Sequence, residues 1–214
     1  MSRNRWIGIL AVLVLLISGA FISFNRANYL RDTVRDELSS QQISFSPAEN
    51  LSEHELQLPG MEKYAGQELT TGDQARVYAS YIKLHLEESS VEAGLPGATY
   101  ATIGGEQRPL RAELTAAIEA NDSARAEQIQ TRLDELSALR DSHFRGNMLR
   151  GTLLNAYGWD LVASYMFIVG WAMTAAAVIT GISAVMIFAV TRRRVEITKE
   201  VSEISPEATP VYAD

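Results

Sequence analysis

The three histidines, His54, His85 and His143, are the side chains in this sequence best suited to metal binding or proton transfer. His54 lies in the run SEHEL, which resembles the start of a zinc-protease helix. That motif needs a second histidine four residues after the first, and a leucine stands there instead. His85 lies at helical spacing among apolar residues, which favours a packed structural histidine over a metal ligand.

His143 follows Asp141 and Ser142, so the three residue types of a hydrolase triad occur side by side. Neighbours on a helix point in different directions and cannot assemble a triad, so we attribute this run to chance composition. The acidic pair Glu87-Glu88, like Glu53 and Glu55, fits a solvated helix face. The chain has no cysteine, which excludes disulfides and thiolate chemistry. The sequence therefore predicts no enzyme, no cofactor and no metal site.

Two long apolar segments flank the polar middle region that carries these side chains. The first, residues 6–24 (WIGILAVLVLLISGAFISF), has 19 residues without a charge, which at about 1.5 Å per residue nearly matches a hydrocarbon core of about 30 Å. A cleaved signal peptide is the alternative, because Ser18-Gly19-Ala20 offers a small-x-small site. Helical spacing of apolar residues continues through Leu30 and Leu38, so we favour an uncleaved helix that leaves the membrane.

The second apolar segment, residues 161–190, has 30 residues without a charge. This is about 45 Å of helix, so the segment must tilt or place its first turns at the interface. Small residues recur four apart, at Gly170 and Thr174 and again at Ala177 and Gly181, a spacing that permits close helix approach. This spacing therefore favours a homo-oligomer that forms through the small-residue face of the second span.

Basic residues give the orientation. Arg3 and Arg5 precede the first span, and three arginines, 192–194, follow the second. By the positive-inside rule both termini, residues 1–5 and 191–214, are cytoplasmic, and the chain crosses the plasma membrane twice. The tail over 191–214 is acidic and punctuated by proline, so we expect it to be disordered.

The middle region, residues 25–160, is then extracytoplasmic. It carries 13 Lys/Arg and 21 Asp/Glu, a net charge of −8, whereas nucleic-acid binding needs a basic surface. We expect helix over 25–40 continuing the first span, loop with short ordered pieces over 41–71, and a helix from Thr71 that ends at Gly94. The fold class is an all-α membrane protein with two transmembrane helices flanking a mainly helical domain.

Further along, residues 98–103 (ATYATI) could be extended, Gly104-Gly105 reads as a turn, and Pro109 is placed as the first-turn proline of a helix. The run Asn121-Asp122-Ser123 signals a turn or cap that divides the following helical pattern in two. We expect the second helix to run into the second span, with a possible break at Gly146 or Gly151.

The stretch FRGNMLRGTLLNAYGW, residues 144–159, is the most informative part of the chain. Its candidate contact residues are Arg145, Arg150, Asn155, Tyr157 and Trp159. We interpret them as an interfacial collar that meets lipid head groups or acidic side chains on neighbouring helices. A ligand or partner site is the alternative.

Three stretches, 64–86 (YAGQELTTGDQARVYASYIKLHL), 99–101 (TYA) and 144–159, together resemble a family of uncharacterised two-span membrane proteins of high-GC Gram-positive bacteria. The resemblance implies the same topology and a cell-envelope setting, and it carries no activity and no functional residues. Members are sometimes labelled ring-opening dioxygenase subunits, but this sequence lacks the His/carboxylate iron site that such a label needs.

We therefore expect a non-enzymatic membrane protein, an accessory or scaffold subunit whose outer helical domain binds another envelope component, with a protein partner in the membrane or envelope. The alternative is an extracytoplasmic sensor or ligand-binding module that signals through a separate partner, since the cytoplasmic tail is too short to be an output domain.

Overall fold

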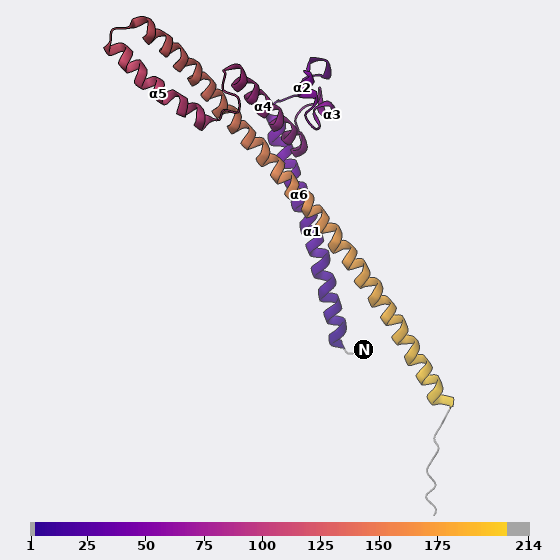
Figure 1. Ribbon diagram of the computed structural model, residues 1–214. Coiled ribbons are helices and arrows are strands. Elements are labelled where there is room, and N and C mark those ends of the chain that lie inside the picture. Colours follow the sequence, from indigo (N-terminus) through magenta and orange to yellow (C-terminus); the bar gives the residue numbers. More distant parts are fainter. Residues whose placement is uncertain (1–2, 205–214) are drawn as a thin grey trace, which may run out of the picture. The chain divides into compact units, whose positions relative to one another are not determined.

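The computed structural model describes residues 3–204, and every regular element within that range is a helix (Figure 1). In chain order the elements are α1 (Arg3–Ser40), η1 (Ala48–Asn50), α2 (Glu53–Leu56), α3 (Met61–Tyr64), α4 (Gly72–Glu92), α5 (Tyr100–Glu119) and α6 (Ser123–Ile204). A lone antiparallel bridge joins Ser44 and Glu68. The all-α prediction is confirmed for this part of the chain.

The helices form two compact units. The first, here called the apolar unit, comprises the described residues up to Asn28 and from Ser164 onward. The second, the middle unit, comprises Tyr29–Ala163. Both α1 and α6 contribute to each unit. These two helices are also the ones that are long and apolar enough to cross a membrane, among the residues that the structure describes.

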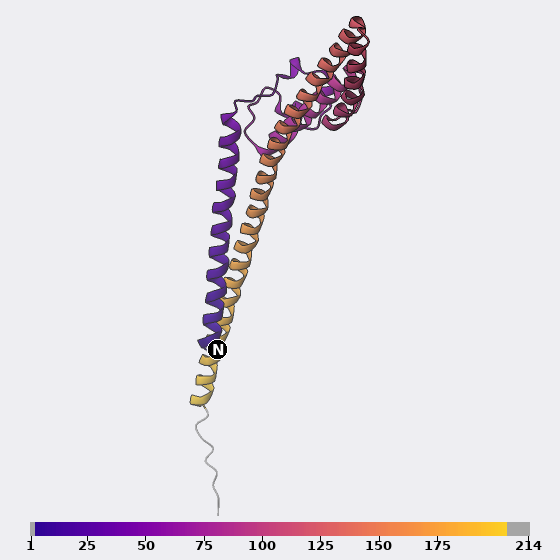
Figure 2. The same cartoon turned by 90° about the vertical axis from the view of Figure 1, so that its left-hand side faces the viewer.

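In the apolar unit, α1 and α6 run antiparallel and side by side (Figure 2). Trp6 meets Phe188 with ring centroids 5.9 Å apart, and Phe24 meets Trp171 at 5.5 Å. Gly170 lies against the Phe24 ring so closely that an added Cβ would clash. Part of the small-residue face predicted for contact between copies is therefore occupied by α1 of the same chain.

The core of the middle unit gathers around α4. Val77 and Ala79 of α4 pack with Val34 and Leu38 of α1 and with Leu153 of α6. The segment between α1 and α4 contributes the buried side chains of Phe45, Met61, Tyr64 and Leu69. Residues 41–71, predicted as loop with short ordered pieces, thus cover this core. Burial of their apolar side chains stabilises the short helices within them.

Helix α4 begins where the sequence predicts. Thr71 accepts a hydrogen bond from the Gln74 backbone N–H, and the Gln74 side chain accepts one from the Thr71 backbone N–H, a reciprocal capping box. At the other end Gly94 has φ of +75°, a left-handed conformation that glycine adopts without strain.

Helices α5 and α6 form a hairpin closed by Ile103, Leu136 and Leu139 near its base and by Ala117, Ile129 and Leu133 near its turn. Asn121 has φ of +54° in that turn, so the predicted division of the two helices is confirmed. Three other expectations are wrong. The ATYATI run is helical from Tyr100, Gly104-Gly105 is within α5, and Pro109 lies inside the helix, because a capping box between Thr99 and Thr102 starts α5 earlier.

Helix α6 is continuous from Ser123 to Ile204, so the break considered at Gly146 or Gly151 does not occur. Gly146 instead lets α6 approach the Leu86 side chain closely. The predicted disordered tail is also wrong for residues 191–204, which continue the helix; residues 205–214 lie outside the described residues.

Candidate functional site

Two of the predicted collar residues, Arg145 and Arg150, have different environments. Arg145 is exposed and pairs with Asp141 one turn earlier on α6, at 2.8 Å. Arg150 is half-buried, and its Nε donates to the backbone carbonyl of Ala79 on α4 at 3.1 Å, while Nη1 donates to Asn147 at 3.0 Å. Arg150 therefore links α6 to α4 by a hydrogen bond, whereas Arg145 lies on the surface.

The other three collar residues also divide. The guanidinium of Arg76 lies 5.8 Å from the centre of the Tyr157 ring, so Tyr157 packs on α4. Asn155 is exposed, and Trp159 is 52% exposed. Asp160, which follows, approaches Arg31 of α1 at 3.8 Å and packs on Gly72. Inward-facing and outward-facing residues thus alternate along α6. The five predicted collar residues therefore do not form a single site.

The outward residues belong to a stripe along α6 whose members recur at alternating steps of four and three. We call it the α6 stripe, and it consists of Phe144, Met148, Gly151, Asn155, Gly158 and Val162. Phe144 and Met148 are 51% and 58% exposed. Alternating steps of three and four are the spacing of helix–helix seams, and an asparagine within such a seam fixes register. Sequence reasoning identified Asn155 but not this periodicity.

A second feature of the middle unit is an apolar cavity of about 310 Å³, which we call the slot. One wall is the face of α1 that begins at Leu30 and runs to Gln41, and the other is the face of α6 from Leu149 to Trp159. The slot is lined by Leu30, Thr33, Val34, Glu37, Leu38, Gln41, Ile43, Leu149, Thr152, Leu153, Ala156 and Trp159. Its volume is at the small end of the range for ligand sites.

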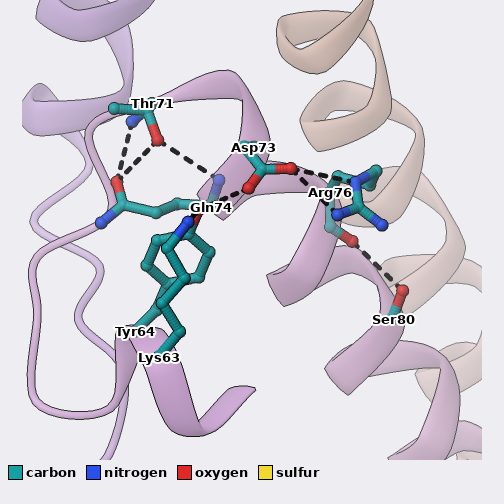
Figure 3. A network of polar contacts seen from close by, with 7 residues as sticks. All are labelled: Lys63, Tyr64, Thr71, Asp73, Gln74, Arg76 and Ser80. Carbon is teal, nitrogen blue, oxygen red and sulfur yellow. Dashed lines mark hydrogen bonds and ion pairs between the residues drawn. The ribbon is translucent and has the colours of Figure 1, made fainter. Parts of the chain in front are cut away.

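A polar network surrounds the start of α4 (Figure 3). Tyr64 donates its hydroxyl proton to Asp73, which also accepts two hydrogen bonds from Arg76, at 3.2 and 2.9 Å. Lys63 donates to the Tyr64 oxygen at 2.8 Å. The pKa of Asp73 is lowered, chiefly by the Tyr64 hydrogen bond and then by Arg76. Every polar group here has a partner within the chain, so the network fixes α3 on α4.

Histidines and glutamates form a row between α2 and α4. His85 Nε2 lies 3.0 Å from Glu55 and its Nδ1 lies 3.3 Å from Glu88, which in turn lies 3.6 Å from His54. The interpretation of Glu55 as part of a solvated face is wrong, since Glu55 is buried. No group of three or more His, Asp or Glu among residues 5–198 has the arrangement of a metal site.

Glu55 is held as a carboxylate mainly by its own helix. The Ser52 backbone N–H donates to it at 2.6 Å as the second half of a capping box, and this bond lowers the pKa of Glu55 below its usual range. The hydroxyl of Ser52 and the neighbouring His85 act in the same direction against the opposing effect of burial. The row therefore anchors α2 to α4.

His143 does not belong to a catalytic triad. It is buried, and its Nε2 lies 2.8 Å from the Ser90 hydroxyl on α4. Ser90 also donates to the Leu86 carbonyl at 2.8 Å, so the imidazole is the partner left to donate to Ser90. Asp141 turns to Arg145 instead. The pair is a contact between α4 and α6.

The chain matches no protein-family model, no curated protein and no solved structure. The resemblance to a family of two-span bacterial proteins therefore stays a prediction. The two candidate sites are therefore the α6 stripe and the slot, and both are argued from the geometry of this chain.

Proposed function

We propose that this chain is a two-span plasma-membrane protein whose middle unit lies outside the cytoplasm and whose termini lie inside. The contacts of Trp6 with Phe188 and of Phe24 with Trp171 support the placement, because they align residues 6–24 with 171–188. Each stretch is about 27 to 28 Å of helix, close to the thickness of a hydrocarbon core. Residues 161–170 then form the interfacial turns, with Tyr165 in the aromatic belt.

We further propose that the middle unit is the accessory or scaffold part, which docks a helix of another membrane or envelope protein. The α6 stripe carries this proposal. Its members are exposed except Gly158, which is half-buried, and they have the spacing of a helix–helix seam. The two glycines of the stripe allow a partner backbone to come close. Because α6 itself continues into the span, the partner helix best suited to the stripe also belongs to a membrane protein.

A photocrosslinking amino acid at Met148 tests the docking proposal in intact cells. The matched control is Gln128, which is also exposed on α6 but lies 20 residues away, about 30 Å along the helix. We expect Met148 to give one repeatable heterologous protein adduct that Gln128 does not give. Adducts to a second copy alone, or the same adducts from both positions, would contradict an accessory role.

A second candidate function is a ligand-binding or sensor module, and the slot is the observation that favours it. Its walls come from both α1 and α6, the two helices that continue into the candidate spans. A ligand in the slot would change the contact between these helices, and a separate cytoplasmic partner would pass on the signal.

A further inference from the structure

We infer that the slot binds one acyl chain of a membrane phospholipid, lifted out of the bilayer along α1 and α6. This inference rests on the proposed membrane placement and adds a ligand to it. Three properties of the slot favour an acyl chain as its ligand. They are its shape, the chemistry of its walls, and its distance along the helices from the candidate spans.

The shape is that of a narrow trough. The α1 wall presents residues at steps of three and four from Leu30 to Gln41, and the α6 wall does so from Leu149 to Trp159. The two walls cover twelve and eleven residues, about 15 to 17 Å of helix. The helices are antiparallel, so Leu30 and Trp159 mark one end and Gln41 and Leu149 the other. A linear chain fits such a trough better than a compact ring system does.

The walls are apolar beyond what the residue names suggest. The hydroxyl of Thr33 donates to the Tyr29 carbonyl at 2.8 Å, and that of Thr152 donates to the Leu149 carbonyl at 2.8 Å. Neither threonine hydroxyl therefore has a proton left to donate into the slot. Glu37 is the one ionisable side chain in the lining. Water gains few hydrogen bonds in a slot of this kind, whereas a hydrocarbon chain loses none.

The end marked by Leu30 and Trp159 is the one nearer the candidate spans. Leu30 follows Phe24 by six residues, about 9 Å of helix, while the head-group layer is about 5 to 8 Å thick on each side. A phospholipid at the interface can therefore insert one chain without leaving the membrane. Arg31, which lies 3.8 Å from Asp160, adds a cationic side chain at this end of the slot, on the side that faces the head groups.

Photolabelling of the full chain in vesicles tests the inference. The vesicles contain phosphatidylcholine with a diazirine near the methyl end of one acyl chain. In the bilayer this label lies near the midplane, beside the middle of residues 6–24 and 171–188. Labelled peptides from 34–41 or 149–153 that are lost when the slot is filled report a chain inside the slot. We expect label in both the spans and the slot.

The variant Thr152→Trp fills the slot from α6, and Thr131→Trp is its matched control. Both threonines are exposed on α6 and bond to their own helix, Thr131 to the Glu127 carbonyl at 3.0 Å. We expect slot labelling to fall by about tenfold in Thr152→Trp and to stay unchanged in Thr131→Trp. Thr33→Trp, which fills the slot from α1, should give the same loss and replaces Thr152→Trp if that variant fails to fold.

The outcomes separate the inference from the proposed function. Label confined to the spans overturns the lipid site and leaves the membrane placement intact. Label in neither region overturns the membrane placement itself. Slot labelling that persists in both tryptophan variants also overturns the inference, because the chain would then bind elsewhere.

Discussion

Glu55 is the residue whose environment differs most from its appearance in the sequence. It shares the exposed-looking run SEHEL with another acidic residue, Glu53, yet it is buried, caps α2 and lies 3.0 Å from His85. The capping box of Ser52 and Glu55 is visible in the sequence as Ser followed by Glu three residues later. The contact with His85 is not visible, because thirty residues separate the partners.

At the same scale, acid should weaken the middle unit. Glu55 and Asp73 both have pKa values lowered from about 4.5 and 3.8. A carboxyl that binds its proton less tightly in the folded chain contributes full stability above the unfolded value, and loses it as the pH falls through the folded value. We expect Glu55→Gln to lower the free energy of unfolding by about 1 kcal/mol at pH 7 and by much less near pH 3.

Denaturant unfolding of the full chain in detergent, followed by circular dichroism at both pH values, measures this difference. Glu53→Gln, in the same short helix but exposed, is the control and should change little. A loss in Glu55→Gln that is equal at pH 7 and pH 3 would show that its charge is not what stabilises the unit.

The two arginines of the predicted collar give a second residue-scale prediction. Arg150→Ala removes a charged donor from the Ala79 carbonyl and should lower the free energy of unfolding by about 1.5 to 3 kcal/mol. Arg145→Ala removes only an exposed pair with Asp141 and should cost less than about 0.5 kcal/mol. Thermal unfolding of the two variants measures this difference. Equal losses of stability in Arg150→Ala and Arg145→Ala would contradict a helix-linking role for Arg150 alone.

Among the elements, α4 was the most predictable and α5 the least. Thr71 and Gly94 bound α4 in the sequence as they do in the structure. For α5, Pro109 predicts a helix start, whereas the Thr99–Thr102 capping box that begins the helix lies ten residues earlier. The packing of Ile103 against Leu136 and Leu139 stabilises that first turn, and no local pattern around residue 103 reveals it.

The contact between the start of α4 and α6 is the basis of an element-scale prediction. Gly72 is buried, and a Cβ there would collide with the side chain of Asp160. Gly72→Ala should therefore push α4 away from α6 and lower the free energy of unfolding by about 1 to 3 kcal/mol. Gly105→Ala, in α5 with open space around it, should instead stabilise by up to about 1 kcal/mol.

Chemical denaturation of both glycine variants tests this contrast. A neutral Gly72→Ala would mean that α4 and α6 do not meet closely at Asp160. A destabilising Gly105→Ala would mean that α5 has a neighbour on that side.

For the whole molecule, the sequence was enough to predict two apolar helices, because long charge-free runs have few other uses. It could not predict how α1 and α6 pair. The alignment of Trp6 with Phe188 and of Phe24 with Trp171 depends on contacts more than 140 residues apart. The slot could not be predicted either, because the helical spacing of Leu30 and Leu38 indicates one face of α1 but does not indicate the α6 wall that faces it.

The central claim is the topology, and labelling of single cysteines in intact cells tests it most directly. The natural chain has no cysteine, so each introduced thiol reports alone. Ser123→Cys at the start of α6 and Thr198→Cys near its end are the two positions. We expect a membrane-impermeant maleimide to label Ser123→Cys at once and to label Thr198→Cys only after the membrane is permeabilised. Equal labelling of both without permeabilisation, or the reverse order, would contradict it.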